Sequence, residues 1–261
     1  MEPTNTQEQT QEKKPAAADQ EVVVKIEHVK KSFGNKTVLE DINMVLHKGE
    51  NLVVLGKSGQ GKSVNIKLMV GMLRQDSGSL KIFDQEVADL KPDELKELRK
   101  RVGFLFQSGA LYDSMTVGEN LAFPLTRVLK IKDQGEIDQR VTEMLQSVGL
   151  PDAVNKVPSE LSGGQRKRIG LARTLILKPE IMLYDEPTTG LDPITSREIS
   201  ELILEMQQKY QTSSVIITHD MACAEITADR VIIMNEGKFI AEGTFDELKA
   251  SKDDLVKHFF Q

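Results

Sequence analysis

The sequence predicts an α/β fold, in which strands and helices alternate along the chain. Two observations support this. Short continuous apolar runs have the length of buried parallel strands. Between them, apolar residues recur three and four positions apart, as they do on one face of a helix. Such alternation is typical of a sheet with helices packed on its faces.

Composition and charge narrow the class of protein. The chain has 261 residues, of which 39% are hydrophobic and 28% charged, as in an ordinary globular protein with a buried core. The net charge of −6 argues against a nucleic-acid partner, because such partners are bound through a basic field. The basic runs Arg99–Arg101 and Arg166–Arg168 are interpreted as solvated helix faces. A single cysteine, Cys223, allows no internal disulfide and suggests a reducing compartment, and the four histidines show no metal-ligand spacing.

The predicted elements follow one another in a regular order. The strands are expected at residues 22–24, 52–55, 102–106, 181–184, 215–218 and 231–234. Helices are expected at residues 62–73 and around residues 137–148 and 199–206. Another helix is expected after Pro92, where Leu95, Leu98 and Val102 would form its apolar face. The sequence NEGK at 235–238 predicts a hairpin turn. Thr244 and Glu247 have the spacing of a capping box for a final helix.

The same patterns suggest how the chain is divided. Residues 1–20 lack periodicity and are expected to form a disordered tail. Residues 107–178 contain little strand pattern, so we expect a mainly helical insertion between two parts, 21–106 and 179–261, of a single domain spanning 21–261. The longest apolar run, Leu68–Leu73, is too short to cross a bilayer, and the N-terminus lacks an apolar signal core. The expected location is cytoplasmic unless a partner holds the chain at a membrane.

The sequence GKSGQGKS follows a predicted strand and precedes a predicted helix, which is the context of a phosphate-binding loop. Its glycines would turn backbone N–H groups toward phosphate oxygens, and the helix N-terminus would add partial positive charge. Lys62 would reach the β- and γ-phosphates, and the Ser63 hydroxyl would hold Mg²⁺. The alternative is a glycine-rich loop with a structural role only. The predicted nucleotide-binding residues here are Gly56, Lys57, Ser58, Gly59, Gln60, Gly61, Lys62, Ser63 and Val64.

Two adjacent carboxylates end the predicted strand in IMLYDEP. Successive strand residues point to opposite sides, so Asp185 and Glu186 are expected to play different roles. Asp185 suits the Mg²⁺ shell, and Glu186 suits the general base that orients the attacking water. An acidic pair that caps a helix is the alternative.

A second helix start with free N–H groups is predicted in SELSGGQ. Ser162 and Gln165 have capping-box spacing, and Gly163 and Gly164 would expose the first N–H groups of the helix. This would make another anion-binding helix end. The alternative is a simple capped helix.

Taken together, the motifs GKSGQGKS, LSGGQ, DEPTTGLDP and THD, in this order, resemble the signature set of ABC-type ATPases across Glu21–Gly243. The resemblance implies a P-loop NTPase fold of the ABC ATPase type with a mainly helical inserted subdomain. It also implies that the protein hydrolyses ATP with Mg²⁺ as cofactor.

The resemblance also assigns roles to single residues. Phe33 matches the aromatic residue that stacks on adenine, unless it is an ordinary core residue. Gln107 matches the glutamine that senses Mg²⁺ and the attacking water. His219 matches the histidine that contacts the γ-phosphate, unless it is a structural residue at a strand end. Asp192 matches the loop that communicates across the dimer. The catalytic residues implied are Glu186, His219 and Gln107, and the magnesium residues are Ser63, Gln107 and Asp185.

This chain departs from the family at Val64, where members commonly carry a second hydroxyl residue. The backbone N–H is retained, so the departure should weaken contacts to the α-phosphate only modestly.

The number of motifs bears on assembly. The chain has one phosphate loop and one LSGGQ, and in the ABC arrangement these two do not close on the same nucleotide within one chain. The resemblance therefore implies a head-to-tail homodimer that sandwiches two ATP molecules. ABC ATPases of DNA repair or chromosome organisation would need a long heptad insertion, and none fits this chain. A transporter motor fits best, and a soluble iron–sulfur-assembly type remains open.

The segment Phe106–Leu125, FQSGALYDSMTVGENLAFPL, looks like the corresponding part of Mla/Mce-type phospholipid-transport ATPases, as do PSELSGG and DDLVKHFF. That likeness implies a motor for phospholipid transport at the cytoplasmic face of a bacterial inner membrane, with permease subunits and an Mce-domain lipid-binding subunit as partners. The alternative is the ATPase of another small-molecule or lipoprotein transporter. Leu111 and Tyr112 are expected either to receive a permease helix or to pack inside the helical insertion.

Overall fold

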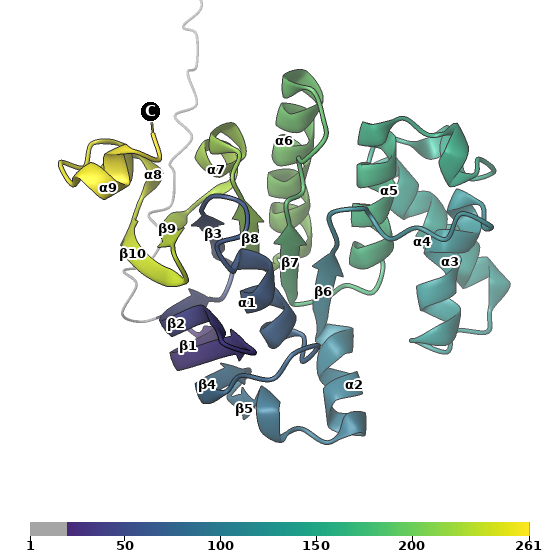
Figure 1. The fold of residues 1–261 in the computed structure, drawn as a ribbon. Coiled ribbons are helices and arrows are strands. Elements are labelled where there is room, and N and C mark those ends of the chain that lie inside the picture. Colours follow the sequence, from purple (N-terminus) through teal and green to yellow (C-terminus); the bar gives the residue numbers. More distant parts are fainter. Residues whose placement is uncertain (1–19, 261) are drawn as a thin grey trace, which may run out of the picture.

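The computed structural model describes residues 20–260, in which the strands form two sheets (Figure 1). The larger, six-stranded sheet has the order β10-β9-β3-β8-β7-β6 and the smaller, four-stranded one the order β2-β1-β4-β5. The larger sheet consists of β3 (Asn51–Leu55), β6 (Val102–Leu105), β7 (Ile181–Asp185), β8 (Ser213–Thr218), β9 (Arg230–Asn235) and β10 (Lys238–Gly243). The smaller sheet consists of β1 (Val22–Phe33), β2 (Lys36–His47), β4 (Ser77–Ile82) and β5 (Gln85–Glu86).

Helices connect these strands and close the chain. They are α1 (Lys62–Met69), α2 (Pro92–Arg101), α3 (Val117–Arg127), α4 (Gln134–Ser147), α5 (Gly163–Leu175), α6 (Pro193–Tyr210), α7 (Met221–Thr227), α8 (Phe245–Lys249) and α9 (Asp254–Lys257). Single 3-10 turns lie at Val87–Asp89, Pro151–Ala153 and Pro158–Glu160. No helix within residues 20–260 is long and apolar enough to cross a membrane.

The predicted α/β class is confirmed by the larger sheet. Strands β6, β7, β8, β3 and β9 pair in parallel in that order, and β10 pairs antiparallel with β9 at the edge. The predicted hairpin joins β9 to β10. Its two loop residues, Glu236 and Gly237, both have positive φ, at 46° and 76°, as a tight hairpin turn of this twist requires. The predicted capping box of Thr244 and Glu247 is also present at the start of α8.

The smaller antiparallel sheet went largely unpredicted, since only residues 22–24 were assigned to a strand there. Its two longest strands, β1 and β2, pair with several register shifts. Positive-φ residues such as His28 and Asp41 interrupt both strands, so the alternation of apolar and polar residues is broken in the sequence. The sequence places Val102 both at the end of a helix face and at the start of a strand. It begins β6, as the strand prediction has it, and α2 ends one residue earlier.

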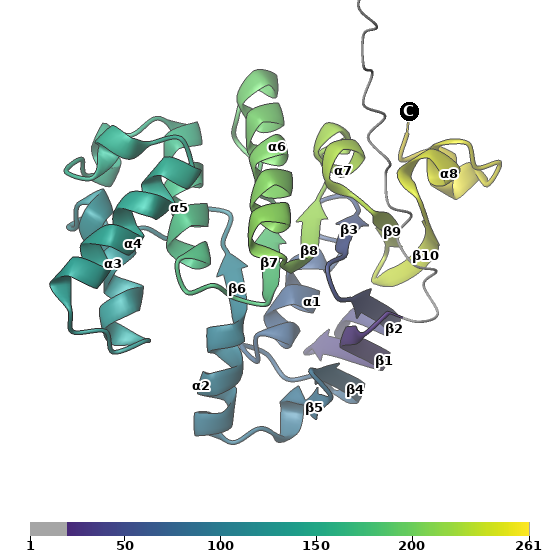
Figure 2. The same ribbon diagram turned by 180° about the vertical axis from the view of Figure 1, so that it is seen from behind.

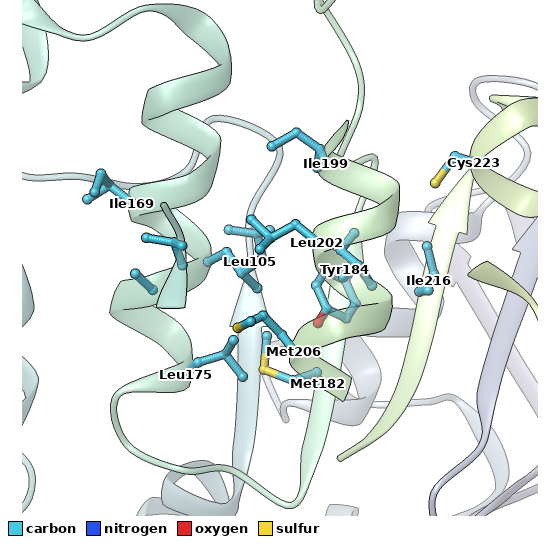
Figure 3. Packing of buried hydrophobic residues seen from close by; sticks show 14 of the residues in the cluster. Leu105, Ile169, Leu175, Met182, Tyr184, Ile199, Leu202, Met206, Ile216 and Cys223 are labelled. Atoms are coloured by element: carbon cyan, nitrogen blue, oxygen red, sulfur yellow. The ribbon is translucent and has the colours of Figure 1, made fainter. Parts of the chain in front are cut away.

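The larger sheet separates two apolar cores. Along β3, Leu52 and Val54 face one core and Val53 and Leu55 face the other, because successive strand residues point to opposite sides. One core also holds α1 and the smaller sheet. The other lies beneath α5 and α6 and includes the fully buried Tyr184, as Figure 3 shows. The free thiol of Cys223 is buried in the same core.

Helices α3, α4 and α5 lie together beyond the β6 edge of the sheet, as both views show (Figures 1 and 2). They occupy the chain between β6 and β7, in which the structure has no strand. The predicted tail, 1–20, lies outside the described residues except for Gln20.

Candidate functional site

The loop between β3 and α1 packs closely against neighbouring backbone. Gly61 has a φ of 103°, and a Cβ on it would lie 2.8 Å from the carbonyl oxygen of Val38. A Cβ on Gly56 would lie 2.7 Å from the carbonyl oxygen of Met234. Neither position leaves room for a side chain, and Gly61 also has a backbone conformation that glycine adopts most easily. The loop can therefore hold the shape that a backbone phosphate cradle needs.

A cavity of about 440 Å³ opens beside this loop. This volume is within the range of small-molecule and cofactor sites. The cavity gathers residues from the loop, from the chain after β6, and from the ends of β7 and β8. The predicted site residues that line it are Ser58, Gly59, Gly61, Lys62, Ser63, Val64, Gln107, Glu186 and His219. Val38 and Thr189 also line it, although the sequence analysis did not single them out.

The ammonium of Lys62 is held at the wall of this cavity. The residue is only 4% exposed. Its Nζ donates to the carbonyl oxygen of Gly56 and, at 2.9 Å, to that of Lys57. It also lies 3.2 Å from Oε1 of Glu186. Charged phosphate oxygens are stronger acceptors than neutral carbonyls, so a triphosphate fits this donor.

The two adjacent carboxylates have different partners, as their places at the end of β7 suggested. Asp185 accepts a hydrogen bond of 2.8 Å at Oδ1 from the Ser63 hydroxyl. Glu186 has a left-handed φ of 52°, which is uncommon for a residue with a side chain. Its Oε2 lies 2.8 Å from Nδ1 of His219. The strand end therefore presents one carboxylate to the phosphate loop and the other to the cavity.

The oxygen atoms around Ser63 suit magnesium that arrives with a nucleotide. In residues 20–260 there is no group of three or more His, Cys, Asp or Glu side chains placed to hold a metal ion by themselves. Magnesium commonly takes one or two protein ligands and completes its shell with substrate phosphates and water. The paired hydroxyl and carboxylate of Ser63 and Asp185 provide protein oxygens of this kind.

A second set of predicted site residues does not line the cavity. Ser162 and Gln165 form the predicted capping box at the start of α5. Gly164 packs against α6, where a Cβ on it would lie 2.5 Å from Cγ2 of Thr195. Asp192 caps α6. The members of this set are Phe33, Ser162, Gly163, Gly164, Gln165 and Asp192.

Phe33 and two further predicted residues, Gln60 and Lys57, have different surroundings. Phe33 ends β1 with 48% of its surface exposed. The side-chain oxygen of Gln60 accepts from the backbone N–H of Glu236. Lys57 Nζ lies 3.0 Å from Nε2 of His258 in the C-terminal segment. An exposed aromatic ring at a strand end is available to a ligand, whereas Gln60 is used inside the protein.

One part of the sequence interpretation was wrong. The run Arg166–Arg168 was assigned to a solvated helix face, but Lys167 is only 7% exposed. Its Nζ donates to the carbonyl oxygen of Gln107 at 2.6 Å and lies 3.4 Å from that of Glu186. Burial lowers the pKa of Lys167, and the nearby Glu186 and Asp185 oppose that change. The spacing gave one usable signal, since Lys167 lies three and four positions before the buried Gly170 and Leu171 and therefore shares their face of α5.

Residues 39–189, more than half of the chain, match the family model described as ABC transporter. The chain belongs to the ABC transporter family. Members of this family bind ATP with Mg²⁺ and hydrolyse it, so the protein is an ABC ATPase. It is the ATPase subunit of an ABC transporter, a class whose cassettes dimerise and pair with membrane permease subunits.

Relatives of this ABC ATPase have names that point to different substrates. A probable ribonucleotide transport ATP-binding protein, mkl, of Mycobacterium leprae is 39% identical, over 91% of this chain and 68% of that protein. The methionine import ATP-binding protein MetN of Campylobacter jejuni is 37% identical, over 91% of this chain and 75% of that protein. The chloroplastic protein TRIGALACTOSYLDIACYLGLYCEROL 3 of Arabidopsis thaliana is 37% identical, over 92% of this chain and 74% of that protein.

Solved ABC ATPases share the fold. A dimeric post-hydrolysis structure of the ATP-binding cassette MJ0796, bound to ADP and Pi, has a TM-score of 0.77 at 30% identity, covering 85% of this chain and 98% of that one. The cbiO1 protein of Clostridium perfringens, part of the ABC transporter complex cbiONQ, has a TM-score of 0.81 at 30% identity. The match covers 92% of this chain and 95% of that one.

Proposed function

We propose that this ABC ATPase drives phospholipid transport of the Mla/Mce type, at the cytoplasmic face of a bacterial inner membrane. Its partners would be permease subunits and an Mce-domain lipid-binding subunit. The main support is the segment Phe106–Leu125, which resembles that of such ATPases and contains the cavity residue Gln107. A relative named for a galactolipid is consistent with a lipid substrate.

The roles of the site residues form part of this proposal. Lys62 would bind the β- and γ-phosphates, and the other residues of the loop Gly56–Val64 would surround them with backbone N–H groups. Ser63, Asp185 and Gln107 would complete the magnesium shell. The place of Glu186 at the cavity, beside His219, supports a general base with the histidine at the γ-phosphate.

The residues outside the cavity would serve a second copy of the chain. Ser162, Gly163, Gly164 and Gln165 lie at the N-terminus of α5 and do not line the cavity beside the chain's own phosphate loop. In a head-to-tail homodimer these four residues would meet the partner's nucleotide, and Asp192 would lie at the contact between copies. Phe33 has a separate proposed role, which is to stack on adenine. We also propose that residues 107–178 act as one helical subdomain within the domain 21–261.

The surface next to Gln107 supports the permease contact. Tyr112 is 42% exposed, and its ring lies 5.0 Å from that of Phe123 and 4.6 Å from the guanidinium of Arg173. Leu111, in contrast, packs partly buried against the core, so only Tyr112 is free for a partner. A cavity of about 250 Å³ between β6 and α3 is lined by Phe123 and Arg173 among others. A short amphipathic helix with an apolar face could enter this groove.

Other transported substrates are the competing proposal. The names of two relatives point to ribonucleotide transport and methionine import, so a small-molecule transporter is the second candidate. Lipoprotein export and iron–sulfur assembly have less support, because no observation on this chain favours either.

Reconstitution tests the proposed function. The chain is co-expressed and co-purified with its permease subunits and placed in liposomes with a fluorescent phospholipid. We expect ATP-dependent transfer of the phospholipid to acceptor vesicles and no ATP-dependent uptake of methionine or ribonucleotides. Uptake of either small molecule without lipid transfer would overturn the proposal.

Tyr112→Asp tests the groove in the same assay. Burying an unpaired charge against an apolar helix is unfavourable, so complex recovery and lipid transfer should fall while ATP binding and melting temperature stay at the parent values. Leu255→Asp, at an apolar site that is 60% exposed on α9, is the matched control. Normal recovery of the Tyr112→Asp complex would contradict the permease contact.

A further inference from the structure

Helix α5 contacts the segment after Gln107 at successive positions along one face. Lys167 Nζ donates to the carbonyl oxygen of Gln107 at 2.6 Å. Three residues on, a Cβ on Gly170 would lie 2.9 Å from the carbonyl oxygen of Gly109. A further three residues on, the guanidinium of Arg173 donates to the carbonyl oxygen of Ala110 at 2.8 Å. Residues three apart share a helix face, so α5 follows this segment for two turns.

Lys167 extends this contact to the catalytic strand end. Its Nζ lies 3.4 Å from the carbonyl oxygen of Glu186, so one side chain reaches two of the segments that line the cavity. Lys167 is only 7% exposed, and its hydrogen-bond partners are backbone carbonyl groups. Burying a cation costs free energy unless its N–H groups find hydrogen-bond acceptors. The Lys167 side chain therefore holds the backbone of Gln107 and of Glu186 in position. It does not serve only to neutralise a carboxylate charge.

We infer that Lys167 is a positioning residue for ATP hydrolysis, which sets the places of Gln107 and Glu186 relative to each other. The inference rests on the roles proposed above for those two residues. Ser162 caps the N-terminal end of α5. Lys167 would therefore transmit a displacement of that end to Gln107 and to Glu186. Small errors in such geometry have large effects on rate, about 10²-fold for a displacement of about 1 Å.

The test compares three variants at Lys167 with the parent. Lys167→Met keeps the length of the side chain and removes the donor, Lys167→Arg restores a charged donor, and Lys167→Gln supplies a neutral donor if the methionine variant folds poorly. Lys178→Met, at an exposed lysine shortly after α5, is the control. The measurements are kcat and KM for MgATP, ATP affinity by calorimetry and melting temperature.

We expect Lys167→Met to lower kcat at least about 10-fold, with KM and ATP affinity changed less than about threefold. Lys167→Arg should recover part of kcat, and Lys178→Met should match the parent. Parent-like kcat in both Lys167→Met and Lys167→Gln would overturn the inference. Equal losses of kcat in all three Lys167 variants, each with a matching loss of melting temperature, would also overturn it, because that pattern indicates a structural role only.

A second comparison separates this inference from the proposed role of Gln107. Gln107→Ala removes the side chain and keeps the carbonyl group that Lys167 contacts. If Lys167 acts by placing Gln107, Lys167→Met should cost less in the Gln107→Ala background than in the parent, as in a double-mutant cycle of coupled residues. Parent-like kcat in Gln107→Ala would reject the role of Gln107 itself. If Gln107→Ala lowers kcat and the two substitutions have fully additive effects on kcat in the double variant, Lys167 does not position the Gln107 side chain.

Discussion

At the scale of single residues, the proposed role of Glu186 depends on how this residue leaves its strand. The preceding Asp185 still belongs to β7 and bonds Ser63. The left-handed φ of 52° at Glu186 changes the direction of the chain, and its carboxylate then lies between Lys62 and His219. An uncommon backbone conformation of this kind is retained where the surrounding contacts determine it. Glu186 is thus held where a water molecule could be activated beside the phosphates.

Glu186→Gln should therefore separate binding from hydrolysis. The amide has nearly the same size, so ATP affinity should stay within about threefold, whereas loss of a general base should lower kcat about 10²–10⁴-fold. Steady-state phosphate release and calorimetry measure the two effects. Glu205→Gln, at an exposed position of α6, should behave as the parent. Hydrolysis by Glu186→Gln at the parent rate would reject the assignment of the base.

At the scale of elements, the helices beyond β6 are joined to the sheet through α5. Its buried side chains include Leu175, which lies next to Met206 and Met182 in the common core (Figure 3), and Ile169, which belongs to the same core. The same helix carries the capping box at Ser162. One element therefore links the signature motif, the segment after Gln107 and the core.

Leu175→Ala should show how strongly this element depends on the core. Leu175 is fully buried, and shortening a buried leucine typically costs about 2–5 kcal/mol in the free energy of unfolding because it leaves a cavity. Leu255→Ala, at a site 60% exposed, should change it by less than about 0.5 kcal/mol. Urea unfolding measures both. Equal losses at the two sites would show that α5 is not anchored by this packing.

At the scale of the whole molecule, the residues proposed to bind nucleotide fall into two groups, of which only one lines the cavity. Lys62 lines the cavity, whereas Ser162 lies at the start of a helix whose N-terminal residues do not line it. A backbone N-terminus with free N–H groups is a good anion site. The arrangement suits a dimer in which each nucleotide is bound by both copies.

Mixing two inactive variants tests this composite site. Lys62→Ala and Ser162→Arg should each hydrolyse ATP poorly alone. In a mixed dimer one site keeps both Lys62 and Ser162, so activity should return to as much as about a quarter of the parent rate for random pairing and independent sites. As a control, Lys62→Ala is mixed with the double variant, which leaves no intact site. No recovery in mixed dimers shown to form would contradict composite sites.

The sequence by itself determined the α/β class, the places along the chain of most parallel strands, the phosphate loop and the capping boxes at Ser162 and Thr244, because each depends on residues close together in the chain. Only the tertiary structure decided the rest. The conformation of Glu186, the burial of Lys167 against Gln107 sixty positions away, and the interrupted strands of the smaller sheet all depend on contacts between distant segments. Local periodicity does not record such contacts, so a buried lysine and a solvated one look alike in the sequence.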